Sequence, residues 1–176
     1  YNSVNRKTSK QGFRWIHDSF GTNWRMTEMQ AALGRIQLQK METWNKLRNR
    51  NANAISACLS KFPDLIYQSE VPHYINHAYY RVYAYIKEEA LNKAWSRDKI
   101  IKQINLSGVP CFSGSCPEIY KEKAFISSGL RPNTDLKNAK SLGTKSIAFL
   151  CHPTLTLQDI RFMNENITHV LSDASR

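Results

Sequence analysis

The amino-acid sequence predicts an α+β fold, an α/β small domain in which three to four short strands carry helices on one face and follow one long helix. Three observations predict it. A helix start signal leads into a long apolar run of helical period, and strand-like and helix-like segments then alternate along the chain. The 176 residues, 41% hydrophobic and 22% charged, suffice for a soluble domain with its own core.

The long helix is expected to begin at Thr27. Thr27 and Gln30 match a T-x-x-Q capping box, in which each side chain satisfies the backbone N–H of the other residue. Apolar side chains then recur mostly at three- and four-residue steps until Pro63, at Met29, Ala32, Leu33, Ile36, Met41, Trp44, Leu47, Ile55, Cys58 and Leu59. At about 1.5 Å per residue this run extends about 50 Å, so the helix should cross between two bodies or lie along one.

The middle of the chain is expected to hold two or three strands and a helix. Residues 65–67 are typical of a short strand, and residues 77–86 form the strongest strand pattern in the sequence. Alternation along that strand places side chains on two faces, Tyr80, Val82, Ala84 and Ile86 on one and Tyr79, Arg81, Tyr83 and Tyr85 on the other. A helix over 88–105 and a strand over 109–112 complete a strand, helix, strand unit.

Short elements are expected in the last third. Residues 118–125 and 136–142 predict short helices, the second ended by Gly143, and residues 147–150 predict a buried strand. Residues 156–171 predict the last helix, capped by its first residue, a threonine. Its inward side chains are expected to be Leu157, Ile160, Met163, Ile167 and Val170.

The formal net charge of +11 raises the question of an anionic partner. Residues 1–50 hold ten Lys or Arg against three Asp or Glu, so the surplus lies mainly in the first third. The chain lacks an RNA-binding string, a zinc finger and a basic helix with interleaved aromatics, so we expect no nucleic acid as partner. A stand-alone basic module that binds nucleic acid or another anion stays the alternative hypothesis, and a basic surface equally suits a diphosphate-bearing nucleotide sugar.

The four cysteines do not indicate a metal site or a disulfide framework. Cys58 and Cys151 fall in apolar patterns and are expected to be buried thiols, whereas Cys111 and Cys116 form a C-x4-C pair without a second pair. We therefore expect no metal and a reduced, cytoplasmic protein. The sequence contains no run of eighteen apolar residues, so no membrane span is expected.

Asn23 and Arg25 stand directly before the predicted helix start. A helix N-terminus presents unpaired N–H groups and the positive end of the dipole, so an amide and a guanidinium beside it suggest an anion site. The alternative is that Asn23 makes a turn bond and that Arg25 is solvated or pairs with Glu28.

Four segments carry a resemblance to a known family. They are Gly21 to Leu38 (G-T-N-W-R-M-T-E-M-Q-A-A-L-G-R-I-Q-L), His77 to Tyr83 (H-A-Y-Y-R-V-Y), Gly108 to Gly114 (G-V-P-C-F-S-G) and His152 to Ile160 (H-P-T-L-T-L-Q-D-I). In this order and spacing they resemble the DegT/StrS-type nucleotide-sugar aminotransferases, which are pyridoxal-phosphate enzymes of fold type I. The resemblance covers nearly the whole chain.

The resemblance implies that part of such an enzyme is missing from the chain. The family's imine-forming lysine lies well upstream of its Gly-x-Asn-x-Arg motif, and Lys7 and Lys10 are too close to Gly21 to take that place. We therefore expect the C-terminal part of the enzyme, with no catalytic residue in this chain and no activity alone. Residues 1–25, with a short strand within 13–20, would end the cofactor-binding domain, and residues 26–176 would form the C-terminal small domain with its long connecting helix.

The resemblance also implies roles for single residues. Asn23 would reach the cofactor phosphate of the neighbouring subunit in a homodimer, and Arg25 would contact phosphate or substrate. His77 would face the mouth of the active site, although a capping or surface histidine is equally compatible with the sequence. The loop residues Ser113, Gly114 and Ser115 would line the sugar site.

For the full-length enzyme, the resemblance implies transfer of an amino group from an amino acid, commonly glutamate, to a keto group of a nucleotide-linked sugar. Surface polysaccharide and antibiotic sugar biosynthesis are both typical of the family. The sugar and the aminated ring position stay open.

Overall fold

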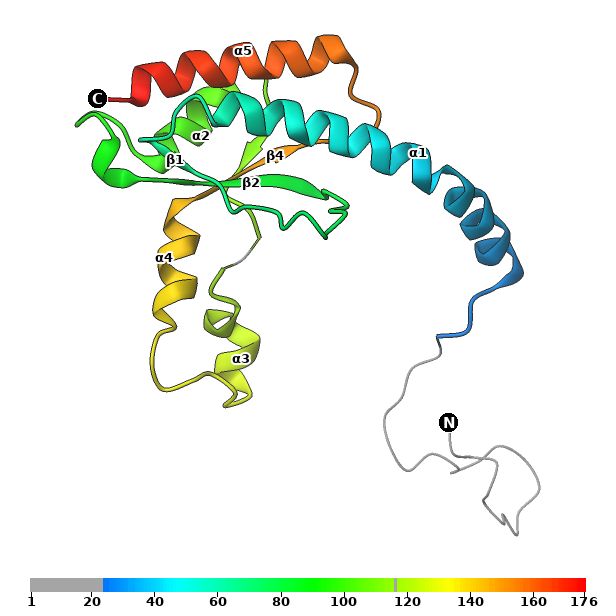
Figure 1. Cartoon of the computed structure of the whole chain (residues 1–176). Coiled ribbons are helices and arrows are strands. Elements are labelled where there is room, and N and C mark those ends of the chain that lie inside the picture. The colour runs from blue at the N-terminus through cyan, green and yellow to red at the C-terminus, as the bar shows by residue number, and fades with distance from the viewer. Residues whose placement is uncertain (1–23, 116) are drawn as a thin grey trace. The chain divides into compact units, whose positions relative to one another are not determined.

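The computed structural model describes residues 24–115 and 117–176 of the chain (Figure 1). The expected strand within 13–20 lies outside the described residues. The α-helices are α1 (Glu28–Leu59), α2 (Arg97–Leu106), α3 (Lys123–Ser127), α4 (Lys137–Lys145) and α5 (Leu157–Ala174), and the strands are β1 (Ile66–Tyr67), β2 (Arg81–Ile86), β3 (Cys111–Phe112) and β4 (Ser146–Leu150). Short 3-10 helices, η2 (Glu88–Ala90) and η3 (Ile119–Lys121), stand between them. These elements confirm the predicted α+β fold.

Contacts divide the chain within α1 into two compact units, Tyr1–Lys40 and Met41–Arg176. The sheet and its helices belong to the second unit. The division predicted at residue 25, between the end of a cofactor-binding domain and a small domain, stays a prediction.

The start of α1 follows from local side-chain chemistry. Gln30 N–H donates to Thr27 Oγ1 at 3.3 Å, and Thr27 N–H donates to Gln30 Oε1 at 2.9 Å, which is the predicted capping box. The apolar stripe is buried only near the end of the helix, where Ile55 and Leu59 are completely excluded from solvent. In the first unit Met29 is 79% exposed, so the helical period there reflects the helix itself and not burial in the described residues.

In the second unit, the described strands form one sheet in the order β1-β2-β4-β3, with every neighbouring pair antiparallel. Strands β2 and β3 therefore run in the same direction but are not neighbours, because β4 lies between them. The two strands of the predicted strand, helix, strand unit are thus separated in the sheet. The register pairs Val82 with Phe149 and Ala84 with Ile147 on one face of the sheet. All four side chains are buried.

That face of the sheet carries the core. The second-unit part of α1 together with α2 and α5 lies against it (Figure 1), and apolar side chains from these helices join the same cluster as the strand residues. Phe149 on the central strand β4 is completely buried, and burying a side chain of this size stabilises the fold by about 1.5–3 kcal/mol. Helices on one face of the sheet therefore hold it, as predicted.

Three predicted element starts in the middle of the chain are wrong. The strand expected over 77–86 begins at Arg81, because Tyr79 has φ +42° and cannot continue an extended strand. The helix expected over 88–105 begins at Arg97, because Leu91 forms an antiparallel bridge with Ser175 and Ser96 caps α2 instead. The strand expected over 109–112 is shorter at its start and consists of β3 alone. Long-range pairing overrides the local helical period at Leu91.

The last third also differs from the prediction in detail. The helix expected over 118–125 is two pieces, η3 and α3, and α4 runs past Gly143 to Lys145. A Cβ at Gly143 would overlap Cγ of Pro117, so this glycine allows close packing and does not end the helix. The predicted capping box of α5 is present at Thr156 and Asp159.

One predicted core position in α5 is also wrong. Leu157 is 58% exposed, because it is the first residue of the helix and the buried stripe begins at Ile160. The other four expected inward side chains of α5 are buried.

The segment between β3 and β4 is held by a polar cluster around Lys121. Lys121 Nζ lies 2.8 Å from Glu118 Oε1 and 3.0 Å from Asp135 Oδ2. Tyr120 Oη donates to Glu118 at 2.5 Å and accepts the Leu136 N–H at 3.1 Å. Hydrogen bonds from Lys121 hold the pKa of Glu118 and the pKa of Asp135 below their usual values.

This cluster predicts an acid-sensitive segment. Because both carboxyl pKa values are lower in the folded than in the unfolded state, their contribution is complete above the unfolded pKa of about 4 and is lost as the pH falls through the folded values. The hydrogen-exchange protection factor of the Leu136 amide should therefore be clearly lower at about pH 3 than at about pH 6. Lys121→Met should lower the protection at about pH 6 and remove most of its pH dependence. Equal protection of the unsubstituted protein at both pH values would contradict the prediction.

Among the described residues, none of the helices is both long enough and apolar enough to cross a membrane.

Candidate functional site

The predicted site residues fall in both units of the chain. Arg25 belongs to the first unit and lies exposed in the segment that leads into α1. Asn23 lies outside the described residues. His77, Ser113, Gly114 and Ser115 belong to the second unit, where the structure relates them to one another through β2.

A cavity of about 340 Å³ lies beside β2 in the second unit. It forms because β1 pairs only with Tyr85 and Ile86, so the part of β2 before Tyr85 has β4 on one side and, within the described residues, no strand on the other. The loop over 68–77 closes this edge. Residues of this loop line the cavity together with Tyr79, Arg81, Tyr83 and Tyr85, the four residues that the sequence places on one face of the strand. Ser56 of α1 and Val82 complete the lining.

His77 lines the cavity and also shapes the turn before β2. Its Nδ1 accepts the Tyr79 N–H at 2.9 Å, and its ring centre lies 4.3 Å from that of Tyr79. Its carbonyl oxygen accepts a hydrogen bond from Asn49 Nδ2 of α1 at 3.0 Å. Because Nδ1 accepts, the proton of the neutral imidazole lies on Nε2, which can donate to a ligand. A capping role and a binding role are thus compatible at this residue.

The loop after β3 is held against the same strand. Ser115 Oγ lies 3.5 Å from Tyr83 Oη, and Gly114 has φ +96°. A Cβ at Gly114 would lie 2.8 Å from Cε1 of Tyr83, so only glycine fits both the backbone conformation and the close approach. Tyr83 therefore connects the loop 113–115 with the cavity that His77 lines.

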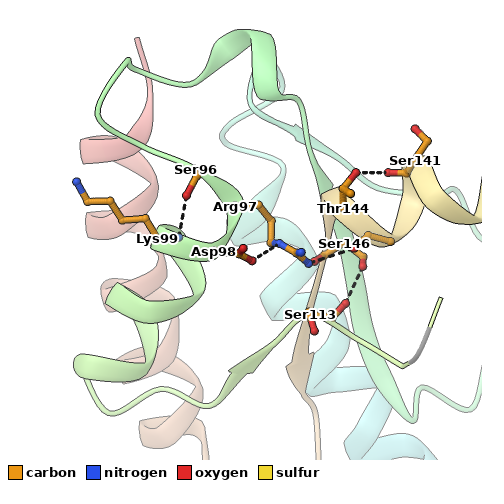
Figure 2. A network of polar contacts seen from close by, with 9 residues as sticks. Ser96, Arg97, Asp98, Lys99, Ser113, Ser141, Thr144 and Ser146 are labelled. Atoms are coloured by element: carbon orange, nitrogen blue, oxygen red, sulfur yellow. Dashed lines mark hydrogen bonds and ion pairs between the residues drawn. The ribbon is translucent and has the colours of Figure 1, made fainter. Parts of the chain in front are cut away.

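Arg97 and Ser146 fix the start of that loop, as Figure 2 shows. Ser146 Oγ donates to the Ser113 carbonyl oxygen at 2.6 Å, and Arg97 Nη1 donates to the Ser146 carbonyl oxygen at 2.9 Å. Arg97 Nη1 also lies 3.3 Å from the carbonyl oxygen of Gly143, and its Nε lies 2.8 Å from Asp98 Oδ1. The loop carbonyl is thereby tied to the start of β4 and to the end of α4.

The sequence did not identify Arg97, Ser146 or Tyr83 as part of a site. The backbone carbonyl partners of Arg97 and of Ser146 stand more than thirty residues away along the chain, so no local motif marks them. Alternation along the strand placed Tyr83 on one face with Tyr79, Arg81 and Tyr85, and this was the one signal in the sequence that could have found it.

Cysteine chemistry is not supported in the described part of the chain. Cys58, Cys111 and Cys151 are buried free thiols, as predicted for Cys58 and Cys151. Burial raises the pKa of Cys111 to about 12, so its thiol stays protonated near neutral pH and is a poor nucleophile. No group of three His, Cys, Asp or Glu side chains in residues 24–115 and 117–176 is arranged to hold a metal ion.

Comparison with known proteins places this small α+β domain, with an open polar sheet face, among aminotransferases. The model of the DegT/DnrJ/EryC1/StrS aminotransferase family matches residues 3–168, and the chain belongs to this family. This membership confirms the resemblance seen in the sequence and favours an enzyme part over a stand-alone basic module. No match was found among curated proteins.

Solved structures agree with this assignment. The aminotransferase from Psychrobacter cryohalolentis is 45% identical over 99% of this chain, with a TM-score of 0.82. The chain spans 46% of that protein's length. Helicobacter pylori PseC, an aminotransferase involved in pseudoaminic acid biosynthesis, is 19% identical, with a TM-score of 0.72 over 88% of this chain and 40% of its own. DesV from S. venezuelae, solved with a ketimine intermediate, is also 19% identical, with a TM-score of 0.71 over 89% of this chain and 40% of its own. The last two show the shared fold alone.

Gly114 and Gly129 provide a matched test of the loop geometry. Both have positive φ, but a Cβ at Gly129 meets nothing within 4 Å. Gly129→Ala should cost about 1–2 kcal/mol of backbone strain. Gly114→Ala should cost about 1–3 kcal/mol more, because its methyl group would overlap the Tyr83 ring. Urea unfolding gives the free energies, and the ring resonances of Tyr83 should shift only in Gly114→Ala. Equal costs with an unmoved Tyr83 ring would contradict the geometry.

Proposed function

We propose that this chain is the C-terminal part of a pyridoxal-phosphate-dependent aminotransferase that acts on a nucleotide-linked keto-sugar. The observation that carries the proposal is the family match over residues 3–168, together with the 45% identity to an aminotransferase of about twice the length. The family is generally dependent on pyridoxal phosphate. A fragment of this extent would supply groups that bind and orient, whereas the imine-forming lysine would come from the rest of the whole protein.

The start of α1 offers donors that suit a phosphate. All residues from Trp24 to Gln30 are exposed, and the capping box satisfies only the N–H groups of Thr27 and Gln30. The N–H groups of Glu28 and Met29 have no acceptor within the described residues and would suit an anion, and Arg25 stands directly before them in the chain. We assign Arg25 and Asn23 to the cofactor phosphate, which Asn23 would reach across a homodimer interface. When bound, the cofactor supplies the electron sink for amino transfer.

The second unit offers donors that suit a sugar. His77 and Tyr83 line one cavity, the Tyr83 hydroxyl lies 3.5 Å from the Ser115 hydroxyl, and the Tyr83 ring presents an apolar surface. Sugars combine hydroxyl groups with apolar ring faces, so convergent polar groups beside an aromatic ring are suited to them. We assign His77, Ser113, Gly114 and Ser115 to this part of the substrate. An amino acid, commonly glutamate, would serve as the amino donor.

The location of the imine-forming lysine tests the proposal. In the whole protein, borohydride reduction after loading with pyridoxal phosphate should fix the label on one lysine outside these 176 residues, which peptide mass analysis would identify. The isolated chain should form no stable imine, and the whole protein should transfer the amino group of glutamate to a nucleotide-linked keto-sugar. Stoichiometric labelling of one lysine within this chain would overturn the proposed division of the enzyme.

The phosphate assignment predicts a loss of cofactor affinity in the whole protein. Arg25→Ala should raise the dissociation constant of pyridoxal phosphate about tenfold to hundredfold, because it removes a charge-assisted hydrogen bond. Arg35→Ala, at an exposed position of α1 in the same unit, is the matched control and should bind the cofactor normally. Fluorescence titration of the apoprotein measures both constants. An unchanged constant in Arg25→Ala would remove this residue from the phosphate site.

A further inference from the structure

Arg81 occupies an unusual position at the start of β2. It lines the cavity beside the strand, on the face of the sheet opposite the core, as does Tyr83. Neither the family resemblance nor the sequence motifs give Arg81 a role. Its surroundings nevertheless differ from those of the other partly buried arginines in the second unit.

Two aromatic rings hold the guanidinium. Its Cζ lies 4.6 Å from the ring centre of Phe112 and 5.3 Å from that of Tyr80. Phe112 stands on β3, on the far side of β4, and both Phe112 and Tyr83 pair with the small residue Ala148. The side chain of Arg81 therefore lies along the open face of the sheet, and the rings fix the orientation of its planar group.

The guanidinium is positioned but has no hydrogen-bond partner within the described residues. Its Nε is buried and makes no hydrogen bond, and no described carboxylate pairs with it. Arg97 Nε is likewise buried without a hydrogen bond, but it lies 2.8 Å from Asp98 Oδ1, and Arg97 Nη1 donates to the Ser146 carbonyl oxygen. Arg48 Nη1 lies 3.4 Å from the Tyr79 carbonyl oxygen. Glu70 also lines the cavity but makes no ion pair with Arg81. The two Nη groups are not among the buried atoms, so they stay accessible on the open face, and an oxyanion that accepts from them competes with no other acceptor in the described part of the chain.

We propose that Arg81 is an oxyanion-binding residue, which takes a phosphate or carboxylate group of a substrate on the open face of the sheet, beside Phe112 and Tyr83. A guanidinium presents its N–H groups in a planar fork that matches such groups in a bidentate manner. On the same face of β2, the Tyr83 hydroxyl lies 3.5 Å from the Ser115 hydroxyl, and these two groups add donors. The proposal rests on the proposed function only for the source of the oxyanion, which is the diphosphate of the nucleotide sugar or a carboxylate of the amino donor.

Direct binding by the whole protein tests the proposal without turnover. Calorimetric titrations would use inorganic pyrophosphate as the phosphate probe and glutarate as the carboxylate probe. Arg81→Gln should weaken the binding of one probe about tenfold or more, and Arg81→Lys should recover only part of it, because lysine lacks the fork. Arg161→Gln, at an exposed position of α5, is the matched control and should bind both probes normally.

Kinetics identify the source of the oxyanion. If the site takes phosphate, Arg81→Gln should lower kcat/KM for the nucleotide sugar about tenfold or more. If the site takes carboxylate, the same substitution should lower kcat/KM for the amino donor to a similar extent. Thermal unfolding checks that the variants fold. Phe112→Leu keeps the charge but removes one ring, and it should weaken the same probe if Arg81→Gln does not fold.

Different results would contradict the oxyanion site and the proposed function. If neither probe binds the unsubstituted protein, or if Arg81→Gln binds both as well as the unsubstituted protein does, the oxyanion site is wrong. If the protein transfers no amino group but loses probe binding in Arg81→Gln, the proposed function fails while the oxyanion site stands.

Discussion

The antiparallel pairing of β2 with β4 is the constraint on which the rest of the second unit depends. Its register places Val82 opposite Phe149 toward the helices and Tyr83 opposite Ala148 on the other face. Because side chains alternate with a period of two, a slip by one residue would exchange these faces completely. The same pairing that buries the core therefore places Tyr83 and Arg81 on the opposite, open face of the sheet. A change in the register would alter the core and the candidate site together.

The open face is useful only if the loop after β3 has a fixed position, and the structure fixes it with buried polar contacts. Ser146 is 92% excluded from solvent and holds the Ser113 carbonyl oxygen, while Arg97 holds the Ser146 carbonyl oxygen. A buried carbonyl oxygen without a partner is destabilising, so each contact satisfies a group that the packing has removed from water. Gly114 then lies against Tyr83, where a larger residue has no room. Hydrogen bonds from the Ser146 and Arg97 side chains to backbone carbonyl oxygens thus hold this irregular loop in a fixed position against the sheet.

The accuracy of the sequence predictions follows the range of the interactions involved. The starts of α1 and α5 were predicted, because Thr27 with Gln30 and Thr156 with Asp159 act within three residues. The start of α2 was wrong, because Leu91 pairs with a residue more than eighty positions away. The site follows the same rule. Strand alternation predicted which tyrosines share a face with Arg81, but the contacts of Arg97 with β4 leave no trace in local sequence.

The chemistry of the described side chains argues for a binding and orienting part rather than for a covalent centre. The best nucleophile by residue type, Cys111, is buried with its pKa raised to about 12, whereas β2 and its neighbouring loops offer a hydroxyl pair, an imidazole and a guanidinium. Groups of this kind stabilise and position charged and hydrogen-bonding substrates. The chain spans 46% of a 45% identical aminotransferase, and such groups agree with the proposal that the covalent chemistry of the whole enzyme lies outside this chain. In such an enzyme the rigidity of the sheet matters more than the reactivity of any side chain on it, because a bound substrate must meet a reacting centre supplied from elsewhere.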